Sequence, residues 1–262
     1  MTTTDEGSCR FFDAIAPRYD ELVSSDPRHA WVRHAFQSLV TETVAPGGWL
    51  LDFGCGTGTD ALWYAGQGYR VIAYDNSAGM ITQLQTKCSA QIARREIVPY
   101  HASYEAYLNQ ELRPCPVAIV SNFAALSAIP GLPRLFAAWA EQLVRPGHII
   151  VSVLNPFFWA DMLRRSWWRD YIRSWGKGTI IRTGGNRPDI YEYFPATLTA
   201  AASPYFVKMS QAGVGALVGG RKTHQSWSAP KTLGERLERR FWKAGPVRTF
   251  GQFIFMVFQK SA

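Results

Sequence analysis

The chain has 262 residues, of which 47% are hydrophobic, 14% aromatic and 18% charged, and its formal net charge is +8. This composition excludes a disordered chain, a collagen and a coiled coil. The charge is uneven: residues 1–150 carry 11 basic and 14 acidic side chains, a net of −3, whereas residues 151–262 carry 17 basic and 6 acidic, a net of +11. A basic half of this kind is compatible with phosphate, nucleic acid or an anionic membrane as its partner.

Signals for membrane insertion, secretion and metal binding are weak in the sequence. The longest apolar runs, such as Phe253–Phe258, fall far short of the ~20 residues of a membrane helix. The N-terminus has neither a basic start nor an apolar stretch. Cys9, Cys55, Cys88 and Cys115 are scattered without a C-x-x-C pair, so we expect no disulfide framework and no metal site. A reduced, cytoplasmic protein is the expectation.

Helical and strand patterns alternate along the first part of the chain. In order, the predicted elements are helix 28–44, strand 49–53, helix 59–66, strand 69–74, helix 77–90, strand 97–101, strand 116–120, helix 132–144 and strand 148–154. Nearly continuous apolar strands alternating with helices predict a doubly wound parallel sheet with helices on both faces. Further on we expect a long Trp- and Arg-rich helix over 156–177, strands near 205–209 and 249–259, and a helix at about 232–243.

The segment after the first predicted strand carries the most specific pattern. Leu51-Asp52-Phe53 leads into Gly54-Cys55-Gly56-Thr57-Gly58, and a predicted helix follows. Glycines allow the backbone to turn tightly and touch a ligand, and the helix N-terminus adds free N–H groups. The spacing is not that of a dinucleotide-binding loop, because Thr59 stands where the third glycine of G-x-G-x-x-G would be. The carboxylate of Asp52 beside the loop disfavours a pyrophosphate and suits a ligand with an amine.

Asp75 ends the second predicted strand, 21 residues beyond Gly54. In doubly wound folds, an acid at about this distance of ~20 residues binds the ribose hydroxyls. The alternative role, capping the helix that follows, can coexist with ribose binding. The glycine loop and Asp75 together therefore predict a nucleoside ligand with an amine-bearing tail and no pyrophosphate. S-adenosylmethionine fits that description.

Five segments resemble the motifs of class I S-adenosylmethionine-dependent methyltransferases. Leu51–Gly58 resembles the first motif, Asp75–Met80 the second acidic motif, Ser121–Phe123 the loop after strand four and Arg145–His148 the segment before strand five. Phe12–Asp20 resembles the N-terminal opening of the ubiquinone and menaquinone methyltransferase-like group. The resemblance covers residues 10–155 well. It implies an α/β fold with a Rossmann-like, doubly wound, seven-stranded and mostly parallel sheet.

The resemblance also implies how the chain is divided. We expect a single methyltransferase domain over 1–262, with N-terminal lid helices at 1–45 and a cofactor-binding core at 46–155. A C-terminal cap inserted at 156–230 would help to choose the substrate. The last helix and strand of the sheet would occupy 231–262.

The cofactor residues follow from the same resemblance. They would be Asp52, Gly54, Cys55, Gly56, Gly58, Asp75, Asn76, Met80, Ser103, Tyr104 and Asn122. The glycine loop would line the methionine part, Asp52 would reach its amino group and Asp75 would hold the ribose. Asn76 and Met80 would lie beside the adenine. Ser103 or the backbone of Tyr104 would replace the acid that the family often carries after strand three.

Other roles remain open at several of these positions. Asn122 either orients the methionine carboxylate or a substrate, or is a simple loop residue, and Cys55 is a small filler or a nucleophile. His101 is a candidate general base at a strand end, with a structural histidine as the alternative. Tyr19 is a candidate catalytic residue that the resemblance places over the sulfonium, with a packed lid tyrosine as the alternative.

The basic half has three readings. Arg165, Arg169, Arg173 and Lys177 recur every four residues, beside an apolar stripe that includes Trp168. The arginines are simply solvated, or the helix lies at a membrane or amphiphilic substrate, or it meets an acidic partner such as RNA.

We therefore expect an S-adenosylmethionine-dependent methyltransferase that releases S-adenosylhomocysteine. Its substrate would be a small, largely apolar or aromatic molecule, because aromatic side chains crowd the cap. They are Phe157, Phe158, Trp159, Trp167, Trp168, Tyr191, Tyr193 and Phe194. The alternatives are an RNA or protein methyltransferase that docks through the basic half, and a non-catalytic module that only binds the cofactor.

Overall fold

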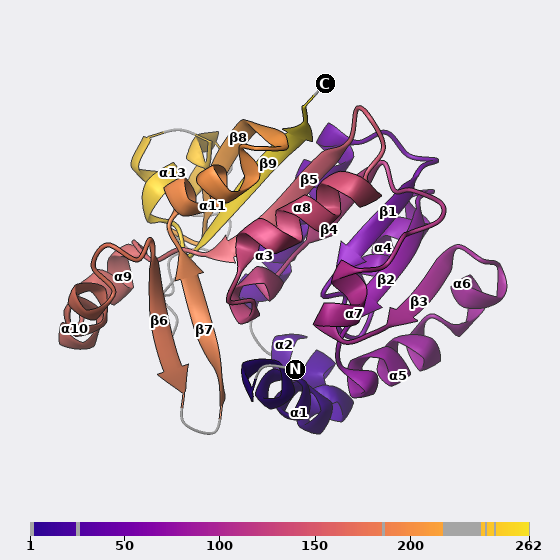
Figure 1. The fold of residues 1–262 in the computed structure, drawn as a ribbon, viewed down its shortest axis with the longest axis horizontal. Coiled ribbons are helices and arrows are strands. Elements are labelled where there is room, and N and C mark those ends of the chain that lie inside the picture. The colour runs from indigo at the N-terminus through magenta and orange to yellow at the C-terminus, as the bar shows by residue number, and fades with distance from the viewer. Residues whose placement is uncertain are drawn as a thin grey trace.

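The computed structural model describes residues 3–24, 27–184, 187–216, 237–238, 240–243 and 245–261. Seven strands form one sheet in the order β3-β2-β1-β4-β5-β9-β8 (Figure 1). They are β1 (Trp49–Phe53), β2 (Arg70–Asp75), β3 (Ile97–His101), β4 (Ala118–Ser121), β5 (His148–Leu154), β8 (Phe206–Val214) and β9 (Phe253–Lys260). Strands β1 to β5 pair in parallel, and β9 is antiparallel to both β5 and β8. The predicted seven-stranded, mostly parallel α/β sheet is confirmed.

Alternating side chains on each strand send apolar groups into two cores. Leu50 lies in the core that packs under α3 (Pro27–Thr43), α4 (Thr59–Gly66) and α5 (Ala78–Lys87). Its neighbour Leu51 points the other way, into the core under α7 (Tyr104–Leu108), α8 (Leu132–Gln142) and α11 (Pro195–Ala202). A strand buried on both faces needs this continuous apolar sequence, which is why these strands could be recognised.

The N-terminal segment stands across the end of the sheet where β1 and β2 terminate (Figure 1). It consists of α1 (Thr3–Ile15), a 3-10 turn at Ala16–Arg18 and α2 (Tyr19–Ser24). Helix α1 contacts α5 and the strand β7 described below. We call residues 3–24 the lid segment. Its position puts it beside the glycine loop.

The region after β5 differs from the prediction. The prediction of a single helix over 156–177 is wrong, because the structure has two separate helices, α9 (Trp159–Met162) and α10 (Arg165–Arg173). Arg164 between them has an extended backbone with ψ 135°, and its guanidinium reaches the buried carboxylate of Asp161 at 3.5 Å. The indole N–H of Trp168 donates to the Met162 carbonyl at 3.0 Å, so a side chain satisfies a group that a continuous helix would have bonded.

Several short elements complete the chain. They are the helices α6 (Ser89–Ala93) and α13 (Gly245–Phe250), the 3-10 turn η2 (Ala125–Ala128), and the hairpin strands β6 (Thr179–Gly184) and β7 (Arg187–Tyr193). The helix expected over 77–90 divides at Cys88 into α5 and α6. The hairpin β6–β7 was not among the predicted elements. Half of the helix expected at 232–243 falls outside the described residues. Among the residues described, none of the helices has the length and apolar character needed to cross a bilayer.

Candidate active site

The glycine loop leaves β1 and turns across the end of β2. The N–H groups of Gly54 and Cys55 both donate to the Tyr74 carbonyl at 2.9 Å, which anchors the loop. Gly54 and Gly56 have φ of 75° and 53°, in the left-handed region that favours glycine. A Cβ on Gly54 would lie 2.5 Å from the Cβ of Ala125, in the loop after β4. The two loops therefore touch only because position 54 has no side chain.

Asp75 closes the loop from the neighbouring strand. One carboxylate oxygen accepts from the Gly56 N–H at 2.8 Å and the other from the Ser77 N–H at 2.9 Å. Burial raises the pKa of Asp75, and the N–H donors of Ser77 and Gly56 oppose that rise. The carboxyl group thus fixes both the glycine loop and the start of α5. Its remaining lone pairs are available to a ligand, so the capping and ribose roles are compatible.

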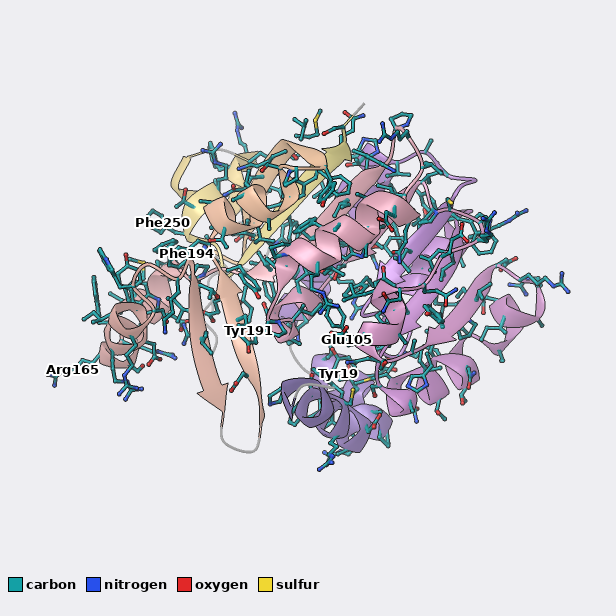
Figure 2. All side chains as sticks on the ribbon, viewed as in Figure 1. Tyr19, Glu105, Arg165, Tyr191, Phe194 and Phe250 are labelled. Atoms are coloured by element: carbon teal, nitrogen blue, oxygen red, sulfur yellow. The ribbon has the colours of Figure 1, made fainter. Side chains whose placement is uncertain are left out.

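A cavity of about 280 Å³ opens between this loop and the lid segment. Eight predicted site residues line it: Tyr19, Gly54, Gly56, Asp75, Asn76, Met80, Tyr104 and Asn122. Much of the remaining wall is apolar and includes Phe12, Phe53, Tyr74, Phe123 and Ile129. In Figure 2, Tyr19 and Glu105, both lining residues, lie close to each other where the lid segment approaches the sheet. The cavity lies at the carboxyl ends of parallel strands, where this type of sheet binds ligands.

The other five predicted site residues do not line this cavity. Asp52 and Cys55 are buried behind the loop, and Gly58 begins α4 with φ 79°. Ser103 accepts from the Ala106 N–H at 3.3 Å and so caps α7. His101 is exposed at the end of β3, where it pairs in register with Asp75. Its role as a general base stays a prediction.

Burial decides the protonation of two of these groups. Burial, reinforced by the charge of Asp60, raises the pKa of Asp52 well above its usual range. Its Oδ2 makes no hydrogen bond with any residue in the described ranges. Burial also raises the pKa of Cys55, with Asp75 and Asp52 adding to the effect. A neutral, enclosed thiol is a poor nucleophile, which favours the filler role for Cys55.

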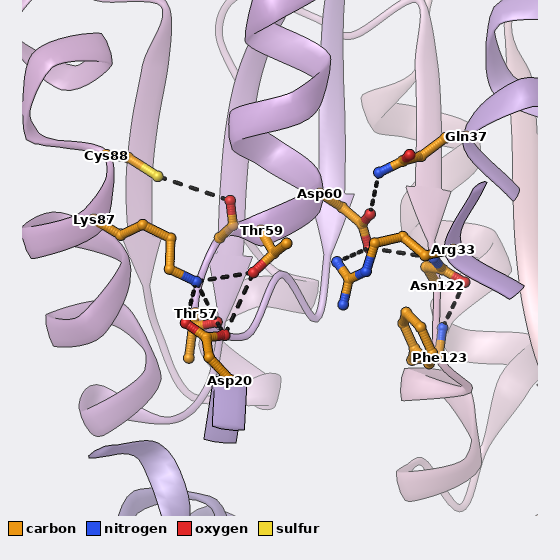
Figure 3. Close-up of polar contacts among 11 residues, drawn as sticks. Asp20, Arg33, Gln37, Thr57, Thr59, Asp60, Lys87, Cys88, Asn122 and Phe123 are labelled. Carbon is orange, nitrogen blue, oxygen red and sulfur yellow. Dashed lines mark hydrogen bonds and ion pairs between the residues drawn. The ribbon is translucent and has the colours of Figure 1, made fainter. Parts of the chain in front are cut away.

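Two carboxylates fasten the lid segment to the site. Asp20 on α2 accepts from the Thr57 hydroxyl and pairs with Lys87 on α5, both at 2.5 Å (Figure 3). Asp13 on α1 accepts from the Ser77 hydroxyl at 2.6 Å and from the Gly79 N–H at 2.8 Å. In the sequence, Asp13 and Asp20 stand out only as parts of the N-terminal motif Phe12–Asp20. Their partners are more than thirty residues away along the chain, which is why their roles were missed.

A second polar cluster lies on the other side of the loop (Figure 3). Asp60 on α4 pairs with Arg33 at 3.0 Å and accepts from the amides of Gln37 at 2.8 Å and Asn122 at 3.2 Å. The Asn122 side-chain oxygen in turn accepts from the Phe123 N–H at 2.8 Å. Asn122 therefore positions the loop after β4 with its side chain. It lines the cavity at the same time.

The loop after β4 has an unusual backbone. Phe123 and Ala124 have φ of 49° and 59°, a conformation that is rare outside glycine. The Arg33 guanidinium lies 4.7 Å from the centre of the Phe123 ring. Arg33 and Phe123 thus belong to the same group of contacting side chains as Asn122. No local pattern in the sequence marks Arg33.

Tyr19 carries a neutral phenol at the cavity. Burial raises its pKa to about 12; Arg33 opposes the rise, whereas Asp75, Asp60 and Asp20 add to it. The ring lies near the glycine loop, since a Cβ on Gly56 would be 3.8 Å from Tyr19 Cε1. At neutral pH Tyr19 can therefore contribute shape and a hydrogen bond but not a phenolate.

The expected aromatic substrate wall in the cap is not at this cavity. None of the eight cap aromatics named above lines the described cavity. Phe158 and Trp167 are buried, and the ring of Trp167 stacks on Tyr171 at 4.9 Å. The Tyr193 hydroxyl donates to the Ile129 carbonyl, so the cap touches the cavity wall from behind. The apolar walls come instead from the lid segment, the ends of β1 and β2, and the loop after β4.

This site defines a class of protein: a Rossmann-like α/β enzyme whose glycine loop and buried acid suit a nucleoside cofactor. Residues 28–182 match the model of a methyltransferase domain family. The match spans more than half of the chain, so the chain belongs to that family and is a methyltransferase. No curated protein matches the chain.

Solved structures share the fold at low sequence identity. The CcbJ methyltransferase of Streptomyces caelestis superposes with a TM-score of 0.64 at 16% identity, covering 98% of this chain and 99% of that one. The 1,6-didemethyltoxoflavin-N1-methyltransferase of Burkholderia thailandensis, solved with bound 1,6-didemethyltoxoflavin and S-adenosylhomocysteine, gives a TM-score of 0.55 at 15% identity, covering 95% of this chain and 89% of that one. A putative methyltransferase of Haloferax volcanii, in complex with the Trm112 activator, gives 0.64 at 15% identity over 96% and 98%. The sequence predicts S-adenosylmethionine as the cofactor, and these matches to methyltransferases confirm that prediction.

Proposed function

We propose that the protein transfers a methyl group from S-adenosylmethionine to a small, largely apolar or aromatic molecule. The observation that carries this proposal is the cavity: its polar end holds the glycine loop and Asp75, and its other walls are mostly aromatic and aliphatic. A pocket of this size and lining is typical of small-molecule sites. The ubiquinone and menaquinone methyltransferase-like group remains the subgroup we expect from the N-terminal motif.

The residues present fit this cofactor. Gly54 and Gly56 present their backbone to the cavity, and Asp75 offers a carboxylate to two hydroxyls. The buried Oδ2 of Asp52 faces no described donor, which supports its assignment toward a cationic amino group, directly or through water. When bound, S-adenosylmethionine supplies an activated methyl group. The part left to the protein is to hold and align the two reactants.

Alignment and exclusion of water are the roles that the chain's own residues perform. The lid segment, held by Asp13 and Asp20, brings Phe12 and Tyr19 to the cavity. These apolar surfaces keep water from the reacting atoms. Tyr19 stays protonated, so it orients the acceptor rather than removing its proton. A substrate whose nucleophile needs no base suits this site best.

The cavity lining does not favour a nucleic acid acceptor. Among the described lining residues the only arginine is Arg134, and it is paired with Glu105 at 2.8 Å. A phosphate group entering here would meet the carboxylates of Asp75 and Glu105. RNA or protein acceptors therefore stay the alternative rather than the proposal.

Calorimetry with S-adenosylmethionine and S-adenosylhomocysteine tests the cofactor half of the proposal. We expect Asp75→Asn to weaken binding by about tenfold or more, because one charged acceptor of the ribose is lost. Glu111→Gln removes the same charge from an exposed position outside the cavity and should bind normally. Unchanged affinity in Asp75→Asn would contradict the assignment.

A turnover assay tests the acceptor half of the proposal. The release of S-adenosylhomocysteine is measured with aromatic phenols, with aromatic amines and with RNA as methyl acceptors. Turnover with RNA alone would refute the small-molecule proposal.

A further inference from the structure

The cap presents an apolar surface that the core does not use. Five large side chains between residues 159 and 175 are exposed, and we call them the cap patch. They are Trp159, Leu163, Trp168, Ile172 and Trp175. The exposed fraction reaches 78% at Leu163 and 73% at Trp175. Scattered apolar residues on a surface are ordinary, but three tryptophans in one short segment are not.

Helix α10 organises most of the patch into a stripe. Trp168 and Ile172 are four residues apart and so share one face of α10, and Trp175 follows in the turn just after the helix. Trp167 lies on another face, where it is buried and donates to the Pro156 carbonyl. The helix is therefore fastened to the protein by one side while the stripe stays outside.

A row of arginines borders this apolar stripe. Arg165, Arg169 and Arg173 recur every four residues along α10 and are exposed. Arg169 lies 3.3 Å from Asp170, whereas no ion pair joins Arg165 or Arg173 to another residue in the described ranges. Figure 2 shows Arg165 at the margin of the molecule, directed away from it. The charges of Arg165 and Arg173 are thus not neutralised by ion pairs within the described residues.

We propose that α10 and the cap patch form a docking surface for an anionic lipid membrane. Tryptophan prefers the interface between headgroups and hydrocarbon, and arginine is attracted to anionic headgroups. A helix with both on adjoining faces lies in the plane of such an interface. With nine residues, α10 is far too short to cross a bilayer, so the contact is peripheral.

The same features argue against other occupants. In a symmetric dimer through this face, each arginine row would lie near its own copy, and like charges would repel. Single-stranded nucleic acid would be held by stacking on the tryptophans, but Leu163 and Ile172 have no flat ring to stack on. A membrane accommodates aliphatic and aromatic groups together.

The position of α10 permits docking without blocking the site. In Figure 1, α10 lies at one margin of the molecule and α6 at the opposite one, with the sheet between them. The cavity described above contains no residue of the cap patch. The docking surface is therefore separable from cofactor binding.

Vesicle sedimentation of the full chain tests the proposal. The probes are vesicles of phosphatidylcholine alone and of equal parts phosphatidylcholine and phosphatidylglycerol, at ionic strengths of about 0.01 M and about 0.15 M. We expect binding to the anionic vesicles only, weaker at the higher salt. The double variant Arg165→Glu/Arg173→Glu should weaken it by about tenfold or more, and Trp168→Ser/Trp175→Ser should weaken it as well.

The matched control is Arg95→Glu/Arg145→Glu, which changes the net charge equally at two exposed positions outside α10. It should bind vesicles much more strongly than the α10 charge variant. Thermal unfolding of each variant verifies that it is folded. Equal loss in the control, equal binding to both vesicles or no binding of the wild type would overturn the proposal. Binding of single-stranded RNA through the same arginines without vesicle binding would also overturn it, as would a dimer that depends on Trp168.

Discussion

The Asp20 contact provides the sharpest test of how the lid segment works. Asp20 joins α2 to Thr57 of the glycine loop and to Lys87 of α5, and the lid segment contributes Ser8, Phe12 and Tyr19 to the cavity. Replacing Asp20 by Asn removes the charge but keeps the shape. We expect the closed arrangement to become less favourable and the affinity for S-adenosylmethionine to fall.

The magnitude follows from the exposure of the pair. Hydrogen bonds to charged groups contribute roughly 1.5–3 kcal/mol, but the Asp20 side chain is 50% exposed, so solvent screens the interaction. If binding requires closure, losing a discounted contribution of about 1 kcal/mol raises the dissociation constant for S-adenosylmethionine roughly fivefold.

The pH dependence of this contact has a definite sign. Burial raises the pKa of Asp20, but the hydrogen bonds from Lys87 and Thr57 outweigh it and lower the pKa below its usual value. A lowered pKa means that the contribution is complete above the ordinary value for aspartate and disappears as the pH falls through the lowered one. The affinity difference between wild type and Asp20→Asn should therefore be constant around neutral pH.

The assay is calorimetric titration with S-adenosylmethionine, and the control lies on the same helix. Glu21→Gln removes one negative charge from a side chain that is 76% exposed and that, among the described residues, forms an ion pair with Arg18 alone, at 3.7 Å. It should bind like the wild type. Equal affinity in Asp20→Asn and Glu21→Gln would refute the idea that this contact holds the lid segment over the site.

Two further predictions concern the loop and the phenol. Gly54→Ala places a Cβ 2.5 Å from that of Ala125 at a φ of 75°, so we expect a lower melting temperature and weaker cofactor binding. The control is Gly66→Ala, because Gly66 lies outside the cavity and has no atom within 4 Å of its Cβ; equal melting temperatures would argue against the packing account. Tyr19→Phe should lower turnover without shifting its pH profile around neutrality, because the pKa of Tyr19 is about 12. If the wild-type turnover titrated between pH ~6 and ~9 and the variant lost that titration, the prediction would be contradicted.

Local sequence patterns were sufficient for the sheet and its ligand-binding end. Each of β1, β2 and β5 is a short apolar run that ends at a glycine, an acid or an asparagine, and the glycine spacing belongs to one loop. The structure confirms a seven-stranded, mostly parallel sheet. Asp75 could be assigned because its distance from Gly54 along the chain reflects one strand–helix–strand unit.

Patterns failed where contacts between side chains decide the backbone. The helical period across 156–177 is real, but the pairing of Arg164 with Asp161 interrupts it. In the hairpin, Arg182 on β6 pairs with the buried Glu192 on β7 at 2.9 Å. The two partners lie on different strands, so the pattern of neither strand alone reveals the pair. Arg33 and Asp60 at the site likewise lie on different elements, α3 and α4.

The uneven charge of the chain can now be divided by what each arginine does. Arg182 is bound between the buried carboxylates of Asp161 and Glu192, at 3.4 and 2.9 Å, so part of the basic excess neutralises acids inside the cap. Removing Arg182 would leave buried acids without their partner, which strongly destabilises a folded protein. Arg182 is therefore a structural cation. Arg165 and Arg173 have no such acid among the residues described and lie beside exposed tryptophans. Net charge alone therefore does not separate structural arginines from those left available to a partner; the pairing of each cation does.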